Sequence, residues 1–359
     1  MSDTNGQKNW MIYGANGYTG ELIAREAARR GLKPLLAGRN KDAVEKLAGE
    51  LKLPYRIFSL GDGSAQHISA DAFAGIDAVI HCAGPFSATA RPMLAACRRA
   101  RCHYMDITGE IQIFEDIFAL HKEIAADGIC AMPGVGFDVV PSDCLANLVC
   151  GALGEKPLHL EMAFRSGGGP SRGTAKTMIE KLGTGTQIRR DGKVVLAPLG
   201  SISREVPKFG TCVAIPWGDV ASAYRSTGSP NISVFIPLPA GARRMLTLMR
   251  PVNFLLRLEA VRNFLTARVE KKMTGPTTSQ RSRSKTTLWA EARSASGRTA
   301  SGTLVCGDGY DVTVLTALAC LEALRGGSAK PGAWTPAQLL GGDFIRGLPG
   351  MTITLVAPK

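Results

Sequence analysis

Three glycines near the start of the chain are spaced to hold a phosphate group. Gly14, Gly17 and Gly20 follow the apolar run Trp10–Tyr13 and open a segment with helical periodicity. Glycine lets the chain turn tightly and lets backbone N–H groups approach an anion with no Cβ in the way. A helix that starts here directs its dipole and its first N–H groups at the same anion. The loop therefore predicts a pyrophosphate cradle, and a tight turn without a ligand is the alternative. The residues expected to line it are Gly14, Asn16, Gly17, Tyr18, Thr19 and Gly20.

The end of the second apolar run indicates which dinucleotide binds. Proteins that bind NAD usually carry an Asp or Glu there, which accepts from the ribose 2′-hydroxyl. Residues 36–40 of this chain read LAGRN, and no acid occurs before Asp42. An arginine can hold a 2′-phosphate with two parallel hydrogen bonds and stack on adenine. We therefore expect NADPH as the cofactor, held by Arg39 and Asn40, with a solvated surface arginine as the alternative.

The elements that must position this loop alternate between apolar runs and helical patterns over about the first 135 residues. Such alternation is typical of a parallel sheet with crossover helices. The expected strands are 10–13, 33–37, 55–58, 78–82, 102–105 and 129–132, and the expected helices are 19–30, 41–51, 89–100 and 112–127. The fold class is therefore α/β, a Rossmann doubly wound parallel sheet with strand order 3-2-1-4-5-6.

The pattern changes after this region. We expect the Rossmann domain to cover residues 1–142, and a mixed α+β second domain to cover 143–306. That second domain would serve the substrate or oligomerisation, with strands at 160–164, 194–196, 231–236 and 286–292. Residues 307–359 are expected to form C-terminal helices that pack back on the Rossmann domain.

Composition excludes several classes of protein. The chain is 45% hydrophobic and 20% charged, which argues against disorder. Its nine cysteines form no C-x-x-C pair, and its five histidines form no H-E-x-x-H motif, so neither disulfides nor a metal site is expected. No stretch reaches the roughly 20 apolar residues that cross a bilayer, and residues 1–8 do not resemble a signal peptide. We expect a cytoplasmic protein.

Four strings of residues match one family in order. The chain resembles the saccharopine dehydrogenase-like oxidoreductases, a family that includes the mycobacterial trans-acting enoyl reductases. The matching strings are Gly14-Ala15-x-Gly17-Tyr18-Thr19-Gly20, Ala83-Gly84-Pro85-Phe86, Tyr104-x-Asp106-x-Thr108-Gly109-Glu110 and Gly136-Phe137-Asp138-x-x-Pro141-Ser142-Asp143. Together with shorter matches further on, the resemblance covers nearly the whole chain. Family members differ widely in chemistry, so the resemblance does not identify the substrate.

The resemblance extends the expected cofactor site. Ala83, Gly84, Pro85 and Phe86 leave the fourth strand at the crevice where doubly wound folds hold a nicotinamide. Asp106 and Glu110 follow the neighbouring strand, and either carboxylate could bind the ribose, the carboxamide or the substrate. The alternative is that Asp106 and Thr108 cap the next helix, since Asp and Thr are good N-caps.

A second glycine-rich loop, 167–174, precedes an expected helix at 175–182. Its hydrogen-bond donors, at Ser171, Thr174 and Lys176, are suited to a carboxylate, a phosphate or an enolate oxygen. A flexible loop with a threonine N-cap is the alternative.

The function that these features favour is an NADPH-dependent oxidoreductase. It would transfer a hydride to a C=C or C=N bond of a small or lipid-like metabolite, as an enoyl reductase or a saccharopine dehydrogenase-like enzyme does. The cofactor carries that chemistry, and no arrangement of residues in the sequence identifies the catalytic proton donor. The alternative is a membrane-associated dinucleotide-binding protein without turnover.

The net charge of +13 is concentrated in one segment. Residues 241–300 hold 13 Lys and Arg but only three Glu. Within 243–272, apolar residues recur at near-helical spacing with arginines between them. Such a segment can lie on an anionic membrane at the inner membrane face, or pack in the core or in a homodimer interface. Nucleic-acid binding is less favoured because few aromatic residues are available to stack on bases.

Liposome flotation separates these alternatives for the segment 243–272. Surface binding predicts flotation with anionic lipid at low salt, since each basic residue near the lipid contributes about 1 kcal/mol. It also predicts loss of flotation at high salt and in the triple variant Arg257→Glu, Arg262→Glu and Arg268→Glu. Neutral liposomes are the control. Absence of flotation under every condition would assign the segment to protein packing.

Overall fold

The computed structural model describes residues 9–61, 68–168, 175, 179, 185–238, 258–272, 275–356 and 358. The chain divides into two compact units. Unit 1 comprises Met1–Gly136 and Thr313–Trp334, and unit 2 comprises Phe137–Val312 and Thr335–Lys359. The expected C-terminal range 307–359 therefore contributes to both units. The expected domain bounds 1–142 and 143–306 stay a prediction.

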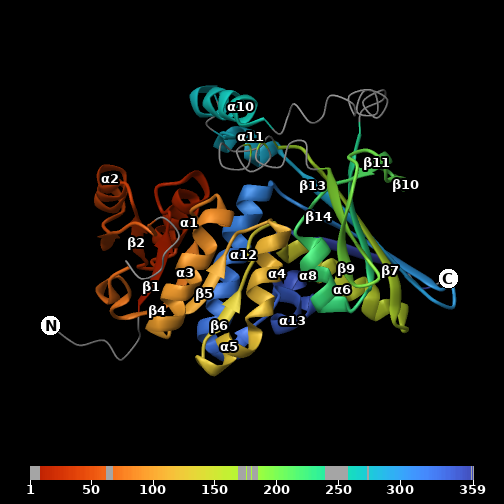
Figure 1. The fold of residues 1–359 in the computed structure, drawn as a ribbon, viewed down its shortest axis with the longest axis horizontal. Helices are drawn as coiled ribbons and strands as arrows, with labels where there is room; N and C mark the ends of the chain where they lie inside the picture. The colour runs from red at the N-terminus through yellow and green to blue at the C-terminus, as the bar shows by residue number, and fades with distance from the viewer. Residues whose placement is uncertain are drawn as a thin grey trace. The chain divides into compact units, whose positions relative to one another are not determined.

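Unit 1 is built on a seven-stranded parallel sheet with the order β15-β6-β5-β4-β1-β2-β3. This confirms the predicted Rossmann order 3-2-1-4-5-6, of which Figure 1 labels β2, β1, β4, β5 and β6, and adds one short edge strand, β15. Its strands are β1 (Asn9–Tyr13), β2 (Leu35–Gly38), β3 (Tyr55–Ile57), β4 (Ile76–His81), β5 (His103–Asp106), β6 (Cys130–Met132) and β15 (Gly332–Ala333). The central strands are nearly continuous runs of buried residues, because a parallel sheet is covered on both faces.

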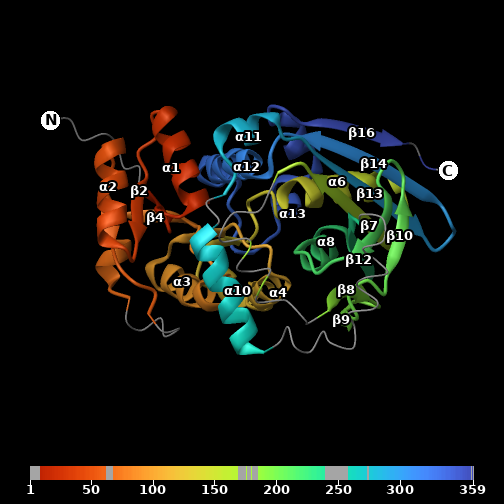
Figure 2. The ribbon, with the colours of Figure 1, turned by 90° about the horizontal axis from the view of Figure 1, so that it is seen from above.

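Helices cover both faces of this sheet. Its helices are α1 (Tyr18–Arg29), α2 (Lys41–Leu51), α3 (Phe86–Ala100), α4 (Ile111–Ala119), α5 (His121–Ala126) and the part of α12 (Gly309–Ala323) that begins at Thr313; short turns are η2 (Ala70–Phe73) and η4 (Leu324–Ser328). The chain runs from β1 through α1 to β2 on one side of β1, and from β4 through α3 to β5 on the other side. Because both connections are right-handed, α1 and α3 lie on opposite faces of the sheet, as Figure 2 shows.

The structure splits one expected helix. Residues 112–127 form α4 and α5, with a break at Leu120. The break lets the His121 ring reach the edge strand, where Nδ1 accepts from the Ala333 backbone N–H at 3.1 Å. Gly332 permits this approach, because a Cβ there would lie 2.6 Å from the His121 ring. This contact between distant residues left no periodic signal in the sequence.

Unit 2 is a mixed sheet with helices, as predicted. The sheet follows the order β10-β11-β12-β7-β13-β14-β16, with the hairpin β8–β9 attached to β12. Only β7 and β12 pair in parallel among these described strands. The strands are β7 (Pro157–Ser166), β8 (Thr186–Arg190), β9 (Lys193–Ala197), β10 (Ser203–Val206), β11 (Gly210–Ala214), β12 (Asn231–Pro237), β13 (Thr286–Ser294), β14 (Thr299–Cys306) and β16 (Thr352–Val356).

Three helices of unit 2 pack together, and two of them lie against this sheet. α6 (Val140–Leu153) packs on β13, β14 and β7, and α8 (Asp219–Thr227) packs on β12 (Figure 2). The third helix of the group is α13 (Pro336–Leu340). Asp143 joins α6 to both α8 and α13, because it accepts from Ser226 Oγ of α8 at 2.5 Å and from the Ala337 N–H of α13 at 3.1 Å. The remaining elements are α10 (Glu259–Lys272), α11 (Thr278–Arg283) and η5 (Gly342–Gly347).

Two further observations concern the chain as a whole. All nine cysteines are free thiols, and most of them are buried. Among the helices in the described ranges, none combines the length and the apolar character that a bilayer crossing requires.

Candidate functional site

The loop between β1 and α1 is held by backbone hydrogen bonds at the centre of the unit 1 sheet. The N–H groups of Gly14 and Ala15 both donate to Ala37 O, at 2.8 and 3.1 Å. On the other side, the Cys82 N–H donates to Tyr13 O at 2.8 Å. The turn is therefore fixed between β2 and β4, at the carboxyl end of the sheet where doubly wound folds bind ligands.

The three glycines of this loop have different roles. Gly14 has φ of +80°, and a Cβ there would lie 2.8 Å from Ala83 N. A Cβ on Gly20 would lie 2.2 Å from Gly14 O. Gly17 has an ordinary φ of −79°, and Gly14 O at 3.2 Å is the nearest described atom to a Cβ there. The fold requires glycine at 14 and 20, whereas a Cβ at 17 would meet a single described atom and is otherwise less crowded.

The first turn of α1 lies directly after Gly17. Gly17 is the N-cap and has no side chain with which to cap the turn, and its carbonyl accepts from the Glu21 N–H at 2.8 Å. Backbone donors and the positive end of the helix dipole together favour an anion here. The predicted cradle residues Asn16, Tyr18 and Thr19 lie on the same loop and first turn, so the geometry fits a pyrophosphate.

The end of β2 approaches the same loop. Gly38 lets the Asn16 side chain lie close, since a Cβ at 38 would be 3.0 Å from Asn16 Oδ1. Arg39 is exposed directly after the strand. Asn40, which the sequence placed on the cofactor, accepts from the Ala43 N–H at 3.1 Å and caps α2. Arg39 is thus the exposed cation at this strand end that could meet a 2′-phosphate.

Arg39 also acts on Tyr13 at the end of β1. Burial raises the pKa of Tyr13 to about 12, and the positive charge of Arg39 opposes that rise. The Tyr13 hydroxyl donates to Phe58 O at 3.1 Å, and the two rings pack with centroids 4.9 Å apart. The wall beside Arg39 is therefore aromatic and neutral.

The loop that follows β4 carries Ala83, Gly84, Pro85 and Phe86. Two side chains fix it: Thr89 Oγ1 donates to Ala83 O at 2.6 Å, and Glu110 Oε1 accepts from the Phe86 N–H at 3.1 Å. Glu110 therefore caps α3, a positioning role that does not require a ligand. The loop is a stiff segment that lies against Gly14, as a nicotinamide-binding crevice requires.

Asp106 is fully buried at the end of β5, and its carboxylate serves the protein. Its oxygens accept from the Tyr104 hydroxyl at 2.6 Å, the Thr108 N–H at 3.0 Å and the Gly134 N–H at 2.9 Å. Burial raises the pKa of Asp106 to about 6, against the effect of these donors, so the group is ionised at neutral pH. It ties the ends of β5 and β6 together and does not cap α4. Contact with a ligand stays a prediction for Asp106 and Glu110.

His81 was not among the residues singled out from the sequence. It is fully buried at the end of β4, and its Nε2 lies 3.0 Å from Thr89 Oγ1. Because the Thr89 proton goes to Ala83 O, Nε2 is the protonated nitrogen of the ring. Burial lowers the pKa of His81 to about 3, so it stays neutral at physiological pH. A polar residue as the last member of an apolar strand was the available signal.

The second glycine-rich loop is described only at its beginning. A Cβ on Gly168 would lie 2.5 Å from Asp308 Oδ2, so this glycine lets the chain pass the start of α12. The predicted substrate residues Ser171, Thr174 and Lys176 lie outside the described residues, as does nearly all of the expected helix 175–182. Their roles stay predictions.

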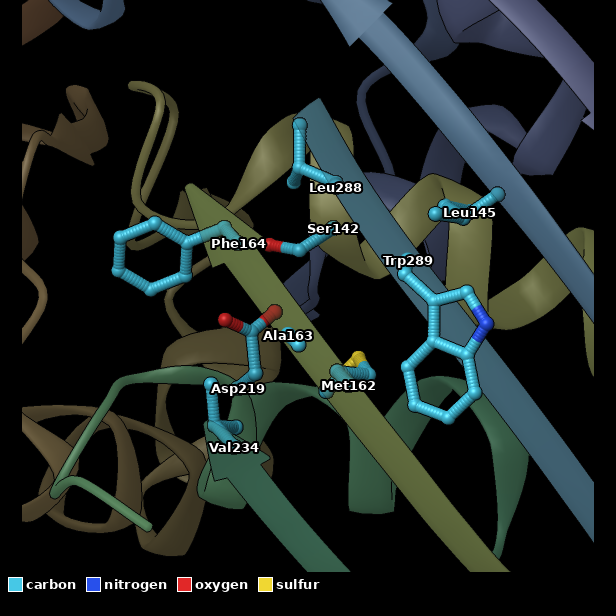
Figure 3. Close-up of a pocket in the computed structure, with 9 residues that line it drawn as sticks. All are labelled: Ser142, Leu145, Met162, Ala163, Phe164, Asp219, Val234, Leu288 and Trp289. Atoms are coloured by element: carbon cyan, nitrogen blue, oxygen red, sulfur yellow. The ribbon is translucent and has the colours of Figure 1, made fainter. Parts of the chain in front are cut away.

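A small cavity lies between the unit 2 sheet and helices α6 and α8 (Figure 3). Its volume is about 10 Å³ measured to the centre of a water molecule, roughly what one water needs. The residues that line it are Ser142, Leu145, Met162, Ala163, Phe164, Asp219, Val234, Leu288 and Trp289. Asp219, only 1% exposed, was not singled out from the sequence. Within the described ranges, no group of three or more His, Cys, Asp or Glu is arranged to hold a metal ion.

Comparisons with known proteins agree with this geometry. Residues 10–132 match the family model described as the saccharopine dehydrogenase NADP binding domain. Saccharopine dehydrogenase (L-Glu forming) of Saccharomyces cerevisiae has a similar fold, with a TM-score of 0.66 over 98% of this chain and 100% of that chain, at 14% identity.

Mycobacterial proteins are similar in sequence. A Mycobacterium tuberculosis protein, whose name assigns it provisionally to the trans-acting enoyl reductases, is 32% identical over 195 residues, 51% of this chain and 46% of its own. A trans-acting enoyl reductase of Mycobacterium leprae is 32% identical over 148 residues, 40% of this chain and 35% of its own. The chain thus spans less than half the length of these relatives.

Substitutions at the three glycines should separate folding from binding. Gly17→Val should fold and lose dinucleotide affinity by at least tenfold, because its side chain occupies the ligand's space. Gly20→Ala should instead lower the free energy of unfolding by about 2 kcal/mol or more, because its Cβ would meet the backbone. The variant should therefore unfold at a lower urea concentration. Circular dichroism in urea and fluorescence titration with NADPH measure the two effects. A folded Gly17→Val protein that binds normally would show that the cradle lies elsewhere.

Proposed function

We propose that this chain, whose residues 10–132 form a saccharopine dehydrogenase-family NADP-binding domain within a saccharopine dehydrogenase-like fold, is an NADPH-dependent reductase. The observation that carries the proposal is the division of roles among Gly14, Gly17 and Gly20. Two of these glycines are required by the turn, and the third leaves space beside the first turn of α1. That is the arrangement expected where a pyrophosphate lies.

The residues of unit 1 would bind and orient the cofactor. Gly17 and the first turn of α1 would hold the pyrophosphate, and Arg39 the 2′-phosphate. The Ala83–Phe86 loop, fixed by Thr89 and Glu110, would form a rigid surface for the nicotinamide end. When bound, the cofactor supplies a hydride. His81 stays neutral and Asp106 is fully engaged, so neither supports a proton-transfer role in unit 1.

For the substrate, we propose a C=C or C=N bond in a small or lipid-like metabolite. The names of the mycobacterial relatives favour an enoyl group. Imine reduction, as in amino-acid-forming relatives, remains in the same proposal because the cradle serves both reactions equally.

We also propose that the protein is cytoplasmic, that it contacts an anionic membrane peripherally and that it forms a homodimer. Helix α10 supports the membrane contact only in part. Leu258 and Phe264 are 49% and 60% exposed. However, the Arg268 guanidinium lies over the Phe264 ring, 5.6 Å from its centroid, so a cation interrupts the apolar stripe. Arg257 and the rest of 243–257 lie outside the described residues.

Cofactor preference tests the role of Arg39. The wild-type protein should bind NADPH about 10- to 100-fold more tightly than NADH, as a charge-assisted contact of about 1.5–3 kcal/mol implies. Arg39→Ala should remove that preference and leave NADH affinity nearly unchanged. Lys41→Ala, which removes an equal charge two residues away, is the control. Equal affinities in the wild-type protein would remove Arg39 from this role.

Turnover tests the reaction itself. NADPH absorbance should fall when an α,β-unsaturated thioester or a cyclic imine is added, and should stay constant with the saturated analogue. The Gly17→Val variant is the control for oxidation by contaminants, since its cradle is blocked. Tight NADPH binding without oxidation across the whole panel would favour the alternative, a dinucleotide-binding protein without turnover.

A further inference from the structure

Asp219 is a buried acid without a hydrogen-bond partner. It is 1% exposed at the first position of α8, and neither carboxyl oxygen is in hydrogen-bonding geometry with any described group. Ser142, the polar side chain beside it, donates its own proton to Val139 O at 3.1 Å. A buried polar group without a partner costs about 1–3 kcal/mol, and native proteins rarely leave one so. A partner from outside the chain would remove this cost.

Two other buried acids among the described residues show the contrast. Asp106 and Asp143 are as deeply buried, and each accepts at least two hydrogen bonds from its own unit. Those two carboxylates join elements of the fold. The Asp219 carboxyl instead lines the cavity and points toward the side where Ser142 lies (Figure 3).

The surroundings of Asp219 favour its neutral form. Burial raises its pKa well above the usual value, the nearby carboxyls of Asp143 and Asp138 add to the rise, and Ser142 opposes it. A protonated carboxyl is a hydrogen-bond donor. The same negative neighbours repel an anion, so a carboxylate or phosphate is disfavoured. The complementary ligand group is an uncharged oxygen that accepts a hydrogen bond.

The remaining walls of the cavity are apolar, and one side meets an aromatic cluster. Phe164, the half-buried wall residue, packs against Trp217 and Phe137 with ring centroids 4.6 and 6.0 Å away. The cavity itself has room for little more than one oxygen atom. The ligand's carbon skeleton would therefore lie on Phe137, Phe164 and Trp217, which are all half-buried.

We propose that Asp219 is the hydrogen-bond donor of a binding site in unit 2 for the carbonyl oxygen of an uncharged, largely apolar ligand, whose skeleton rests on Phe137, Phe164 and Trp217. Ketones, esters, thioesters and amides share this chemistry. The site lies wholly within unit 2, so it does not depend on dinucleotide binding.

A matched series of small probes tests the ligand class on the full-length protein without added cofactor. The probes are cyclohexanone, methylcyclohexane, cyclohexylammonium and cyclohexanecarboxylate, titrated by tryptophan fluorescence and by protein NMR. Cyclohexanone should bind best, by about 5- to 10-fold over methylcyclohexane, the gain expected from one hydrogen bond. Preference for the ammonium or the carboxylate would overturn the proposal.

Variants at Asp219 test the donor. Asp219→Asn keeps an N–H donor of the same shape and should retain cyclohexanone binding, whereas Asp219→Leu should reduce it to the level of methylcyclohexane. Asp191→Asn, an exposed acid of unit 2, is the control. Because Asp219→Leu could fail to fold, infrared difference spectra of the wild-type protein provide a second measurement. Cyclohexanone should shift the carbonyl band of a protonated carboxylic acid, and Asp219→Asn should lack that band. An unshifted band, or a crystal structure with only an ordered water beside Asp219 at saturating cyclohexanone, would overturn the proposal.

Discussion

The close approach of Gly14 to Ala83 is the constraint on which the rest of unit 1 depends. The turn after β1 must pass between β2 and β4, and a Cβ on Gly14 would lie 2.8 Å from Ala83 N and 2.9 Å from Ala83 Cβ. That contact brings the α1 N-terminus and the Ala83–Phe86 loop to the same edge of the sheet. The proposed phosphate cradle and the proposed nicotinamide surface are thus two sides of one packing contact. Thr89 and Glu110 then hold the second side in place.

Three buried aspartates show how a protein can use the same side chain differently. Asp106 is stabilised as an anion by a tyrosine hydroxyl and two backbone N–H groups, and it joins two strand ends. Asp143 joins α6, α8 and α13. Asp219 accepts no well-formed hydrogen bond of this kind, so burial outweighs the opposing effect of Ser142 and favours the proton. The difference comes from the donors available within reach rather than from the depth of burial.

The proposed reductase and the proposed carbonyl site are complementary in chemistry. An enoyl group contains a carbonyl beside its C=C bond. A neutral acid in an apolar cavity recognises such a carbonyl without attracting free carboxylates. The two proposals nevertheless rest on separate residues in separate units, and each stands or fails by its own measurement.

Local patterns in the sequence determined the architecture of unit 1. The strand order and the glycine turn were predicted, because the periodicity of apolar residues and the spacing of glycines are local properties that survive in any compact fold. The contact of Arg39 with a 2′-phosphate stays a prediction. The mixed character of unit 2 was predicted too, but β8, β10, β11, β14 and β16 were not. β14 and β16 contain alternating or small residues whose pairing depends on partners far along the chain.

Tertiary structure alone decided what each polar residue does. Sequence reasoning offered Asp106, Glu110 and Asn40 as ligand contacts, with helix capping as the alternative for Asp106, and ligand contact stays a prediction. The structure adds that each already accepts a hydrogen bond from a backbone N–H of its own unit. It passed over His81 and Asp219, because neither belongs to a motif and both lie within apolar or mixed surroundings. A residue's type and neighbours in sequence state which hydrogen bonds it can make. Only the fold determines which donors lie within about 3 Å of it, and therefore which acids are held by hydrogen bonds from the protein itself.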